Sequence, residues 1–343
     1  MYRFGIIGTG AIADIHIKAI QAIHNAELTG VFNRNLSKAQ KFADTYHCRA
    51  FRDIEELIHC PEVDVVCICT PTGTHRDIAL KVVEAGKHCL IEKPLEITFD
   101  RCQDMIKAAH DANVYLGVIF QSRFYPENRK IKEAIERGRF GNLTIGSAYV
   151  KWNRTKEYYE QAAWRGTWEW DGGGALMNQA IHAVDTLIWF MGDVVSVQAY
   201  MGNFKHHHIE VEDTVVAILK FENGALGTIE CSTAIHPGSL KRIEITGTSG
   251  SATVEDVSIT KWEFADISQE KTQVASDSSN KGGGVSNPMD IGFKGHQLQI
   301  EDFLTAIEEG RKPLIDGYEG AKAVRVVEAI YRSAKNKELI ELN

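Results

Sequence analysis

The chain has no excess of positive charge, which a nucleic-acid-binding protein needs for its contacts with phosphates. Its 343 residues contain 38 Lys and Arg against 46 Asp and Glu, which gives a formal net charge of -8. No apolar run approaches the roughly 20 residues of a membrane-spanning helix. These absences exclude nucleic acid and membranes from the expected partners and favour a small-molecule substrate.

The chain also lacks a disulfide framework. Several of its cysteines lie in apolar, strand-like segments, as reduced thiols do in cytoplasmic proteins. The first residues run straight into a strand pattern instead of a secretory signal, so we expect a cytoplasmic location. The seven cysteines make an odd count with irregular spacing: Cys48, Cys60, Cys67, Cys69, Cys89, Cys102 and Cys231.

Patterns of metal ligands are scarce as well. Cys67 and Cys69 would share one strand face, but no second pair of ligands lies nearby in the sequence. His206, His207 and His208 are consecutive and cannot all face one ion from a strand, so we interpret them as a polar loop. We therefore expect no metal.

The length suits two domains better than one compact core. Residues 1–121 alternate between strand and helix patterns, and residues 63–69 are nearly all apolar, as in a central strand covered on both faces. This alternation predicts an α/β fold with a doubly wound parallel sheet.

Residues 122–343 follow a different pattern. Helical segments near 126–137 and 174–190 precede long β-rich segments, which turn signals separate. We predict a C-terminal α+β domain over 122–343, built on a mostly antiparallel open sheet. Residues 276–288 are rich in Ser, Gly and Asn and predict a loop. Two amphipathic helices close the chain, and their apolar faces can pack back on the first domain.

A glycine-rich turn follows the first predicted strand and opens the first predicted helix, with the sequence Gly-Thr-Gly-Ala-Ile-Ala at 8–13. The glycines permit a tight turn and close approach of a pyrophosphate, which the positive end of the helix attracts. Such a motif alone is weak, but here it occupies the first turn of a βαβ unit. We therefore predict a Rossmann domain over 1–121 that binds NAD(P) through Gly8, Gly10, Ala11 and Ile12.

The end of the second predicted strand lacks the acid that binds the ribose 2′-hydroxyl of NAD. Asn33 and Arg34 stand there instead, and Glu27 comes too early in the strand. A guanidinium suits a 2′-phosphate, although a solvated arginine on a loop is the competing explanation. The pattern leans to NADP over NAD, with Asn33 and Arg34 among the cofactor-binding residues.

Two further predicted strands end in polar segments, and ligands of open α/β sheets bind beyond the carboxyl ends of the strands. Thr70, Pro71 and His75 follow one strand, and Glu92 and Lys93 follow the next. We expect all five to lie beside the cofactor. A lysine at a strand end is usually a solvated charge, but between Glu92 and a proline the ammonium of Lys93 could poise a substrate hydroxyl.

The order and spacing of these motifs resemble the glucose–fructose oxidoreductase / inositol dehydrogenase family. The resemblance rests on Gly-x-Gly-x-x-Ala at 8–13, Thr-Pro-x-x-x-His at 70–75, Glu-Lys-Pro at 92–94 and Gly-Gly-Gly-Ala-Leu-Met-Asn-Gln-Ala-Ile-His-Ala-Val-Asp at 172–185. It covers nearly the whole chain and is specific for the family, though not for a substrate.

The resemblance implies roles for particular residues. Lys93 would contact the reacting hydroxyl, and His182 would be the acid/base. Inositol dehydrogenases commonly carry an aspartate four residues before that histidine, whereas this chain has Asn178, which hydrogen-bonds but cannot accept a proton. The resemblance also implies that the C-terminal open sheet builds a homodimer or a homotetramer.

The helix near 174–190 supports a site independently. Asn178, His182 and Asp185 are spaced to share one face of an otherwise apolar helix, and such a stripe is costly to bury unless it is satisfied or lines a cleft. The competing explanation is a hydrogen-bonded core histidine. Secondary substrate-binding candidates are Arg123, Trp164 and Arg165, because tryptophan faces and arginine forks suit sugars and acidic groups; each could equally be structural.

We therefore predict an NAD(P)-dependent dehydrogenase that acts on a CH–OH group of a sugar, cyclitol or sugar derivative. Lys93 and His182 would handle the proton, with Asn178 as a substrate contact. One alternative is a non-catalytic regulator that keeps the fold and cofactor; the presence of both Lys93 and His182 counts against it. The other is a glycoside-cleaving enzyme that oxidises its sugar transiently and recycles bound cofactor.

Overall fold

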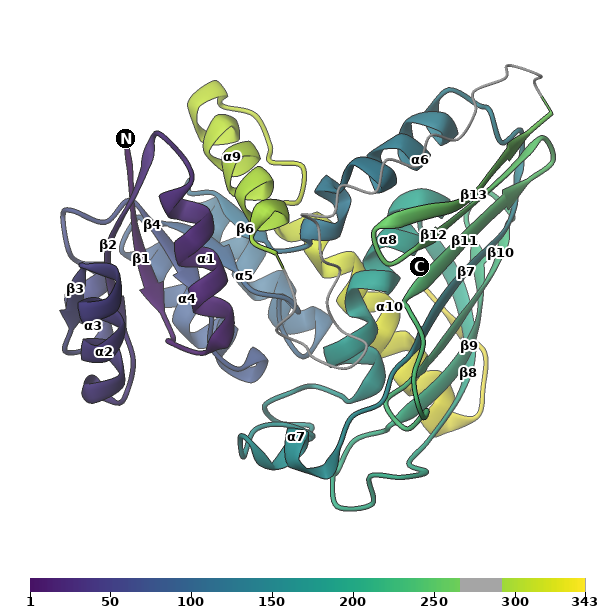
Figure 1. Ribbon diagram of the computed structural model, residues 1–343, viewed down its shortest axis with the longest axis horizontal. Coiled ribbons are helices and arrows are strands. Elements are labelled where there is room, and N and C mark those ends of the chain that lie inside the picture. Colours follow the sequence, from purple (N-terminus) through teal and green to yellow (C-terminus); the bar gives the residue numbers. More distant parts are fainter. Residues whose placement is uncertain (266–291, 343) are drawn as a thin grey trace. The chain divides into compact units, whose positions relative to one another are not determined.

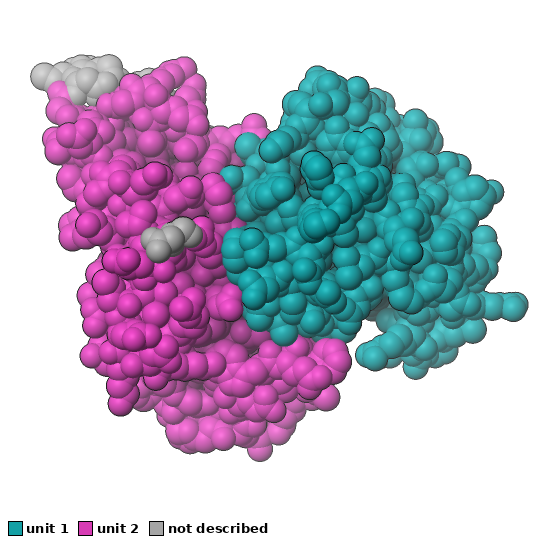
Figure 2. All heavy atoms as spheres, turned by 180° about the vertical axis from the view of Figure 1, so that it is seen from behind, with its two compact units in different colours: residues 1–121, 293–321 teal, residues 122–292, 322–343 magenta. Residues whose placement is uncertain are grey.

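The computed structural model describes residues 1–265 and 292–342, so the loop predicted at 276–288 lies outside the described residues. The chain divides into two compact units, which Figure 2 colours separately. Unit 1 comprises residues 1–121 and 293–321, and unit 2 comprises residues 122–292 and 322–343. The first helix after the undescribed segment thus belongs to the unit that the N-terminal segment forms.

Unit 1 is built on a six-stranded sheet whose strands are all parallel and follow the order β3-β2-β1-β4-β5-β6. This is the strand order of the dinucleotide-binding doubly wound fold. Figure 1 shows the helices of this unit around the sheet. Its strands are β1 (Tyr2–Ile7), β2 (Ala26–Phe32), β3 (Arg49–Phe51), β4 (Val65–Ile68), β5 (His88–Ile91) and β6 (Leu116–Val118). Its helices are α1 (Ala11–Gln21), α2 (Leu36–Tyr46), α3 (Ile54–Ile58), η1 (Thr72–Thr74), α4 (His75–Glu84), α5 (Phe99–Asp111) and α9 (Lys294–Glu309).

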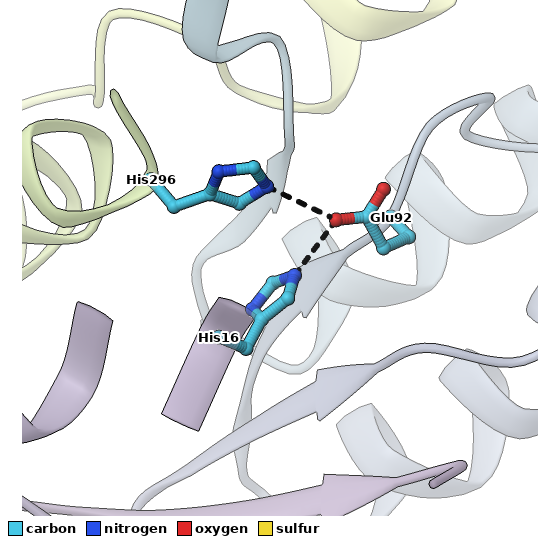
Figure 3. Close-up of side chains that lie close together, drawn as sticks. All are labelled: His16, Glu92 and His296. Atoms are coloured by element: carbon cyan, nitrogen blue, oxygen red, sulfur yellow. Dashed lines mark hydrogen bonds and ion pairs between the residues drawn. The ribbon is translucent and has the colours of Figure 1, made fainter. Parts of the chain in front are cut away.

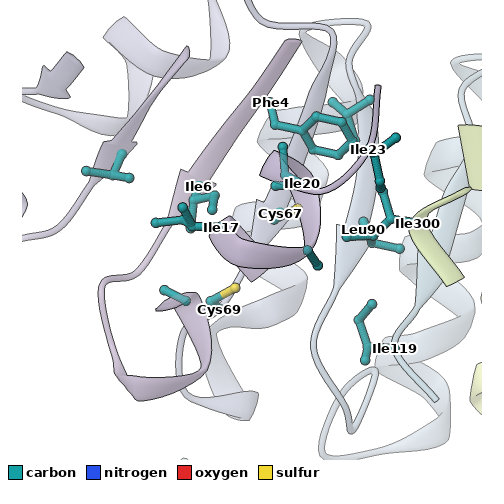
Figure 4. Close-up of a cluster of buried hydrophobic side chains, with 14 of the residues drawn as sticks. Phe4, Ile6, Ile17, Ile20, Ile23, Cys67, Cys69, Leu90, Ile119 and Ile300 are labelled. Atoms are coloured by element: carbon teal, nitrogen blue, oxygen red, sulfur yellow. The ribbon is translucent and has the colours of Figure 1, made fainter. Parts of the chain in front are cut away.

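The core of unit 1 joins the sheet to helices from both ends of the chain. Phe4 and Ile6 of β1, Ile17 of α1, and Ile300 and Phe303 of α9 are all buried in one apolar cluster, part of which Figure 4 shows. Each fully buried side chain of this size contributes roughly 1.5–3 kcal/mol to folding. Helix α9 is therefore held in unit 1 by its apolar face, although more than 170 residues separate it from β6.

Unit 2 is built on an eight-stranded sheet in the order β13-β12-β11-β7-β10-β9-β8-β14. Only the pair β7 and β10 is parallel in this sheet, so it is mostly antiparallel. Its strands are β7 (Leu143–Lys151), β8 (Val194–Gly202), β9 (Thr214–Phe221), β10 (Leu226–Ser232), β11 (Arg242–Gly247), β12 (Gly250–Glu255), β13 (Ser258–Phe264) and β14 (Ile340–Glu341). Its helices are α6 (Pro126–Glu136), α7 (Lys156–Glu160), η3 (Ala175–Ala180) and α8 (Ile181–Met191); η2 (Gln121–Phe124) and α10 (Gly317–Asn336) pass from unit 1 into unit 2.

The two faces of the unit 2 sheet differ. Strand β9 alternates strictly, with Val215, Ala217 and Leu219 buried while Val216 and Ile218 are exposed. Such alternation marks a sheet with one face on a core and one face open. The buried face packs against the helices, α8 among them, and the open face carries apolar side chains.

The predicted fold class is confirmed: unit 1 contains a doubly wound parallel sheet and unit 2 contains a mostly antiparallel sheet. The prediction omitted three strands, β3, β7 and β14. Strands β3 and β14 are only three and two residues long, and β7 mixes apolar residues with Thr, Gly, Ser and Lys without a strict alternation. The helix predicted at 174–190 is a π-helix, η3, followed by α8. Among the described residues, no helix is long and apolar enough to cross a membrane.

Candidate functional site

The turn between β1 and α1 has the geometry that a pyrophosphate requires. Gly8 has a φ of +100°, and a Cβ built on it would lie 2.6 Å from the carbonyl oxygen of Cys69, so only glycine fits. A Cβ on Gly10 would meet nothing within 4 Å, so the space above the turn is open. Helix α1 begins at Ala11 without a side-chain cap, which leaves the N–H groups of its first turn available to an anion. The turn therefore fits the dinucleotide that the sequence predicts.

The tip of β2 is organised around Asn33. Its side-chain amide donates to Thr9 Oγ1 at 2.8 Å, and its Oδ1 accepts the N–H of Asn35 at 2.8 Å. Asn35 in turn caps α2. Arg34 is exposed on this tip and has no carboxylate neighbour within the segment 31–37, so an anion such as a 2′-phosphate would meet no acid there.

The segments after β4 and β5 are tied together by His75. Its ring is buried, with Nε2 2.9 Å from the carbonyl oxygen of Thr70 and Nδ1 3.0 Å from that of Pro94. The imidazole thus bonds to backbone on both sides. His75 therefore connects Thr70, which follows β4, with Pro94, which follows β5.

Glu92 and Lys93 follow β5 directly. Glu92 is 6% exposed, and its Oε1 lies 2.7 Å from Nε2 of His16 and 3.5 Å from Nε2 of His296, as Figure 3 shows. Its Oε2 accepts the backbone N–H of Lys93 at 3.2 Å. Lys93 itself is half-buried. Neither histidine is predicted as a site residue, since nothing in the local sequence indicates that either meets Glu92.

In unit 2 the residues expected on one helix lie at a π-to-α junction. Asn178 and Gln179 belong to the π-helix η3, and His182 follows in the first turn of α8. Single π turns of this kind occur frequently at functional sites because they change which side chains face one direction. Asn178 and His182 are half-buried, as side chains that line a ligand site would be.

A cationic cluster surrounds this junction. Arg154 is buried and donates to Gln179 Oε1 from Nη2 at 2.8 Å and from Nε at 3.1 Å. Gln179 donates to the hydroxyl of Tyr158 at 2.7 Å, and Arg165 donates to the same hydroxyl. The guanidinium of Arg165 also stacks over the Tyr158 ring, 4.4 Å from its centre. Burial raises the pKa of Tyr158, so the phenol stays neutral between the two cations.

One carboxylate belongs to the same cluster. Asp171 accepts the N–H of Gly166 at 2.9 Å and the side-chain amide of Asn178. The cluster of Arg154, Tyr158, Arg165, Asp171, Asn178 and Gln179, which we call the arginine cluster, therefore holds two guanidiniums against one carboxylate. Of its members, Asn178 and Arg165 are site residues predicted from the sequence, whereas the local sequence around Arg154 and Gln179 gives no sign of their place in the cluster.

Two other sequence candidates lie apart from the hydrogen bonds of this cluster. Arg123 is 1% exposed and donates to Asp185 from Nε at 3.0 Å and from Nη2 at 2.7 Å. This two-pronged ion pair joins η2 to α8, so the geometry indicates a structural role for Arg123 and accounts for Asp185. Trp164 stacks beneath Arg165, with the guanidinium 4.8 Å from its ring centre, and so supports the arginine cluster.

The N-terminus of η3 is capped by a buried carboxylate. Glu212 accepts the N–H groups of Gly174 and Leu176, each at 2.8 Å, and the hydroxyl of Tyr331 at 3.0 Å. Burial raises the pKa of Glu212 to about 7, even though these donors lower it. Glu212 thereby fixes the start of the helix that carries Asn178.

This raised pKa predicts a pH-dependent stability. An acid whose pKa is higher in the folded state stabilises the fold below its ordinary value of 4.5 and loses that contribution as the pH rises through about 7. The loss amounts to about 3 kcal/mol for a shift of this size. We expect the melting temperature of the wild type to fall between pH 5 and pH 8 relative to that of Glu212→Gln, whose amide resembles the protonated acid. Exposed Glu222→Gln is the control. If the melting temperatures of the wild type and Glu212→Gln changed in parallel with pH, the raised pKa of Glu212 would be refuted.

Two family models match the chain. Residues 2–120 match the model described as oxidoreductase family, NAD-binding Rossmann fold, and residues 128–253 match the model described as GFO/IDH/MocA C-terminal domain. The matched residues include the dinucleotide turn, the segments after β4 and β5, and the arginine cluster with η3 and His182.

Individual relatives agree with these matches over almost the whole chain. The WlbA dehydrogenase of Bordetella pertussis, solved in complex with NADH and UDP-GlcNAcA, is 35% identical with a TM-score of 0.88, and the alignment covers 99% of this chain and 98% of that one. The corresponding enzyme of Chromobacterium violaceum, with the same two ligands, is 32% identical with a TM-score of 0.87, covering 100% and 96%. The myo-inositol 2-dehydrogenase of Thermotoga maritima is 27% identical over 99% of this chain and 98% of its own length.

Proposed function

Because the chain belongs to the GFO/IDH/MocA family of NAD-binding dehydrogenases, we propose that it oxidises a hydroxyl-bearing carbon of a sugar derivative that carries a carboxylate. The observation that carries this proposal is the arginine cluster of unit 2, where Arg154 and Arg165 converge on one tyrosine hydroxyl and one glutamine. A planar guanidinium binds a carboxylate through two parallel hydrogen bonds. A neutral polyol has no negatively charged group that could bind to the guanidiniums of Arg154 and Arg165.

The named ligands of the relatives support a nucleotide-linked sugar acid. The two solved WlbA dehydrogenases, at 35% and 32% identity, were crystallised with UDP-GlcNAcA. Inositol 2-dehydrogenase relatives, whose named substrate is a neutral cyclitol, are less similar at 27% and 26%. We therefore propose that the substrate class is a nucleotide-linked sugar acid rather than an inositol or a free aldose.

We assign the proton chemistry to two residues. Lys93, whose backbone N–H is fixed by Glu92, is proposed to accept the proton of the reacting hydroxyl, and His182 to assist as acid/base. Asn178 is proposed to hydrogen-bond the substrate, since its amide cannot carry a proton. The nicotinamide cofactor, when bound, supplies the acceptor for the hydride.

The choice of nicotinamide cofactor is proposed to depend on Arg34. The relatives solved with NADH favour NAD, whereas the exposed guanidinium and the missing acid at the tip of β2 also permit NADP. If Arg34 binds the 2′-phosphate, Arg34→Ala should weaken NADPH binding at least tenfold and change NADH binding less than twofold. Fluorescence titration of both cofactors measures this. An equal loss of affinity for NADPH and NADH would show that Arg34 does not bind the 2′-phosphate.

The open face of the unit 2 sheet is proposed to join copies of the chain into a homodimer or homotetramer. The open face of four adjacent strands carries five apolar side chains that are 50–74% exposed: Tyr200, Val216, Ile218, Leu226 and Ile145. Contiguous apolar surface of this kind is rare on monomers. We expect Ile218→Glu to reduce the mass measured by light scattering to that of a monomer, while Leu36→Glu, an exposed apolar site in unit 1, leaves it unchanged. A wild type that is already monomeric would contradict the proposal.

A cytoplasmic location is proposed as well. All seven cysteines lie in the described part of the chain and form no disulfide with one another, and most are buried. Reduced thiols of this number are expected in a reducing compartment.

The function is tested by incubating the purified protein with NAD or NADP and following absorbance of the reduced nicotinamide. The substrates are UDP-linked sugar acids, the matching neutral UDP-sugars, inositols and glycosides. A rise with the sugar acids alone supports the proposal. Glycoside cleavage without net reduction would favour the self-recycling enzyme, and tight cofactor binding without any reaction would favour the non-catalytic regulator.

A further inference from the structure

A buried cluster of titratable side chains in unit 1 takes no part in the chemistry described so far. His16 comes from α1, Glu92 from the end of β5 and His296 from α9, and all three are at most 6% exposed. Figure 3 shows both imidazoles directed at one carboxylate oxygen. The two rings also contact each other edge to face, with centres 5.3 Å apart. We call these residues the His–Glu–His cluster.

The charges in this cluster have a definite arrangement. Burial disfavours the imidazolium of His16, but the nearby thiols of Cys69 and Cys67 and the Glu92 carboxylate together raise its pKa well above the ordinary value. Burial likewise opposes ionisation of Glu92, yet the two histidines hold its pKa well below the ordinary value. Burial lowers the pKa of His296. The 2.7 Å contact between His16 Nε2 and Glu92 Oε1 supports an imidazolium paired with the carboxylate, whereas burial favours the neutral form of His296.

The geometry favours a hydrogen-bonded cluster over a metal site. The three ligand atoms lie within 4.8 Å of one another, as two histidines and a carboxylate around an ion would. However, His16 Nε2 and Glu92 Oε1 are 2.7 Å apart, the length of a charge-assisted hydrogen bond. Two ligands bound tetrahedrally to zinc at about 2.1 Å stand roughly 3.3 Å apart. A histidine that keeps its proton also has no lone pair to offer at that nitrogen.

The cluster is connected to Lys93 through Glu92. The N–H of Glu92 donates to the carbonyl oxygen of Ile68 at 3.0 Å, which fixes this peptide to β4. Oε2 of Glu92 accepts the N–H of Lys93, while Oε1 is occupied by the histidines. The residue next to Lys93 is thus a buried carboxylate whose charge His16 compensates.

We propose that His16 neutralises Glu92 beside Lys93 and that both are positioning residues for the proposed proton acceptor. The inference rests on the proposed role of Lys93. With His16 protonated, Lys93 stands next to a neutral pair and can release its proton. Without the imidazolium, a bare buried carboxylate would stabilise the ammonium form of Lys93 and keep it from accepting a proton. Among the described residues, the titratable groups that meet the cluster are Cys67 of β4 and Cys69, which follows that strand.

The test compares wild type, His16→Gln, Glu92→Gln and the double variant in single-turnover reduction of bound cofactor between pH 5.5 and pH 10. Because the bare carboxylate raises the proton affinity of Lys93, the midpoint of the rising limb should move up by about one pH unit in His16→Gln. It should return to within about 0.3 unit of wild type in the double variant, because both charges are gone. Exposed His59→Gln is the matched control.

A merely structural role would lower the rate without moving the midpoint, so superimposed profiles for wild type and His16→Gln would overturn the inference. One equivalent of zinc in the purified wild type, lost in His16→Gln, would overturn it too. If the wild type reduces no cofactor with any sugar acid, this result contradicts the proposed function and not the inference about His16 and Glu92.

The protonation states of the His–Glu–His cluster can be measured directly, even if the protein shows no turnover or His16→Gln does not fold. Imidazole ¹⁵N shifts of the wild type should show His16 doubly protonated at pH 7.5 and His296 neutral. Glu92→Gln should leave both imidazoles neutral. A neutral His16 in the wild type would overturn the inference.

Discussion

Lys93→Met is expected to lower the single-turnover rate of cofactor reduction by roughly 10³-fold, within the range that a positioned acid or base contributes. Methionine keeps the length and the apolar stem of the lysine but has no group that accepts a proton. The backbone at this position is held by Glu92 through a hydrogen bond that methionine also makes, so the local structure should persist.

The control for this variant is Lys81→Met, an exposed lysine of unit 1 that pairs with Glu55. Both variants should bind NADH as the wild type does, since the dinucleotide turn lies elsewhere in the sequence. Stopped-flow absorbance gives the rate and fluorescence titration gives the affinity. A Lys93→Met rate within tenfold of the wild type would remove Lys93 from the mechanism.

Arg165→Gln is expected to reduce kcat/KM for a nucleotide-linked sugar acid by about 30- to 100-fold, the loss of a charge-assisted hydrogen bond. The effect should be largely in KM, because the guanidinium would hold the substrate equally before and during hydride transfer. For the matching neutral nucleotide sugar the change should be less than threefold. The variant would thus have a lower ratio of kcat/KM for the acid to kcat/KM for the neutral sugar.

The matched control is Arg137→Gln, an exposed arginine of unit 2 that pairs with Glu133 on the same helix. Initial rates with both substrates measure the preference. If kcat/KM fell equally with the acid and the neutral sugar, Arg165 would support the Tyr158 ring but would not bind a substrate carboxylate. This result would contradict the proposal that the substrate is a sugar acid.

The sequence predicts what is local. The turn at Gly8 and Gly10 is recognisable because tight turns and close phosphate approach need glycine at fixed spacing, and strands such as β4 are recognisable because complete burial needs an unbroken apolar run. Strand and helix patterns alternate regularly through residues 1–121, so the doubly wound sheet could be predicted from the residues alone.

Contacts between distant segments could not be predicted. His16 and His296 meet Glu92 from helices 280 residues apart, and a single histidine on each helix gives no sign of this. Arg154 likewise joins the arginine cluster through Gln179, 25 residues later. The ion pair of Arg123 with Asp185, 62 residues later, is another such contact that the residue types alone do not predict.

The π-helix at Ala175–Ala180 marks another limit. The spacing of Asn178, His182 and Asp185 was interpreted with the regular α-helical period, which places all three on one face. The wider π turn and the backbone cap by Glu212 change the direction of Asn178, so that it bonds to Asp171 while Asp185 pairs with Arg123. Nothing in the local sequence distinguishes the two helical periods.

The central claim is that this chain moves hydride from a hydroxyl-bearing carbon of a nucleotide-linked sugar acid to nicotinamide. The most direct measurement uses UDP-linked sugar acid deuterated on its ring carbons, followed by mass spectrometry of the bound cofactor after one turnover. We expect one deuterium on the reduced nicotinamide of the wild type and, over the same reaction time, almost none with Lys93→Met. Unlabelled reduced cofactor, or cofactor that stays oxidised in the wild type, would contradict it.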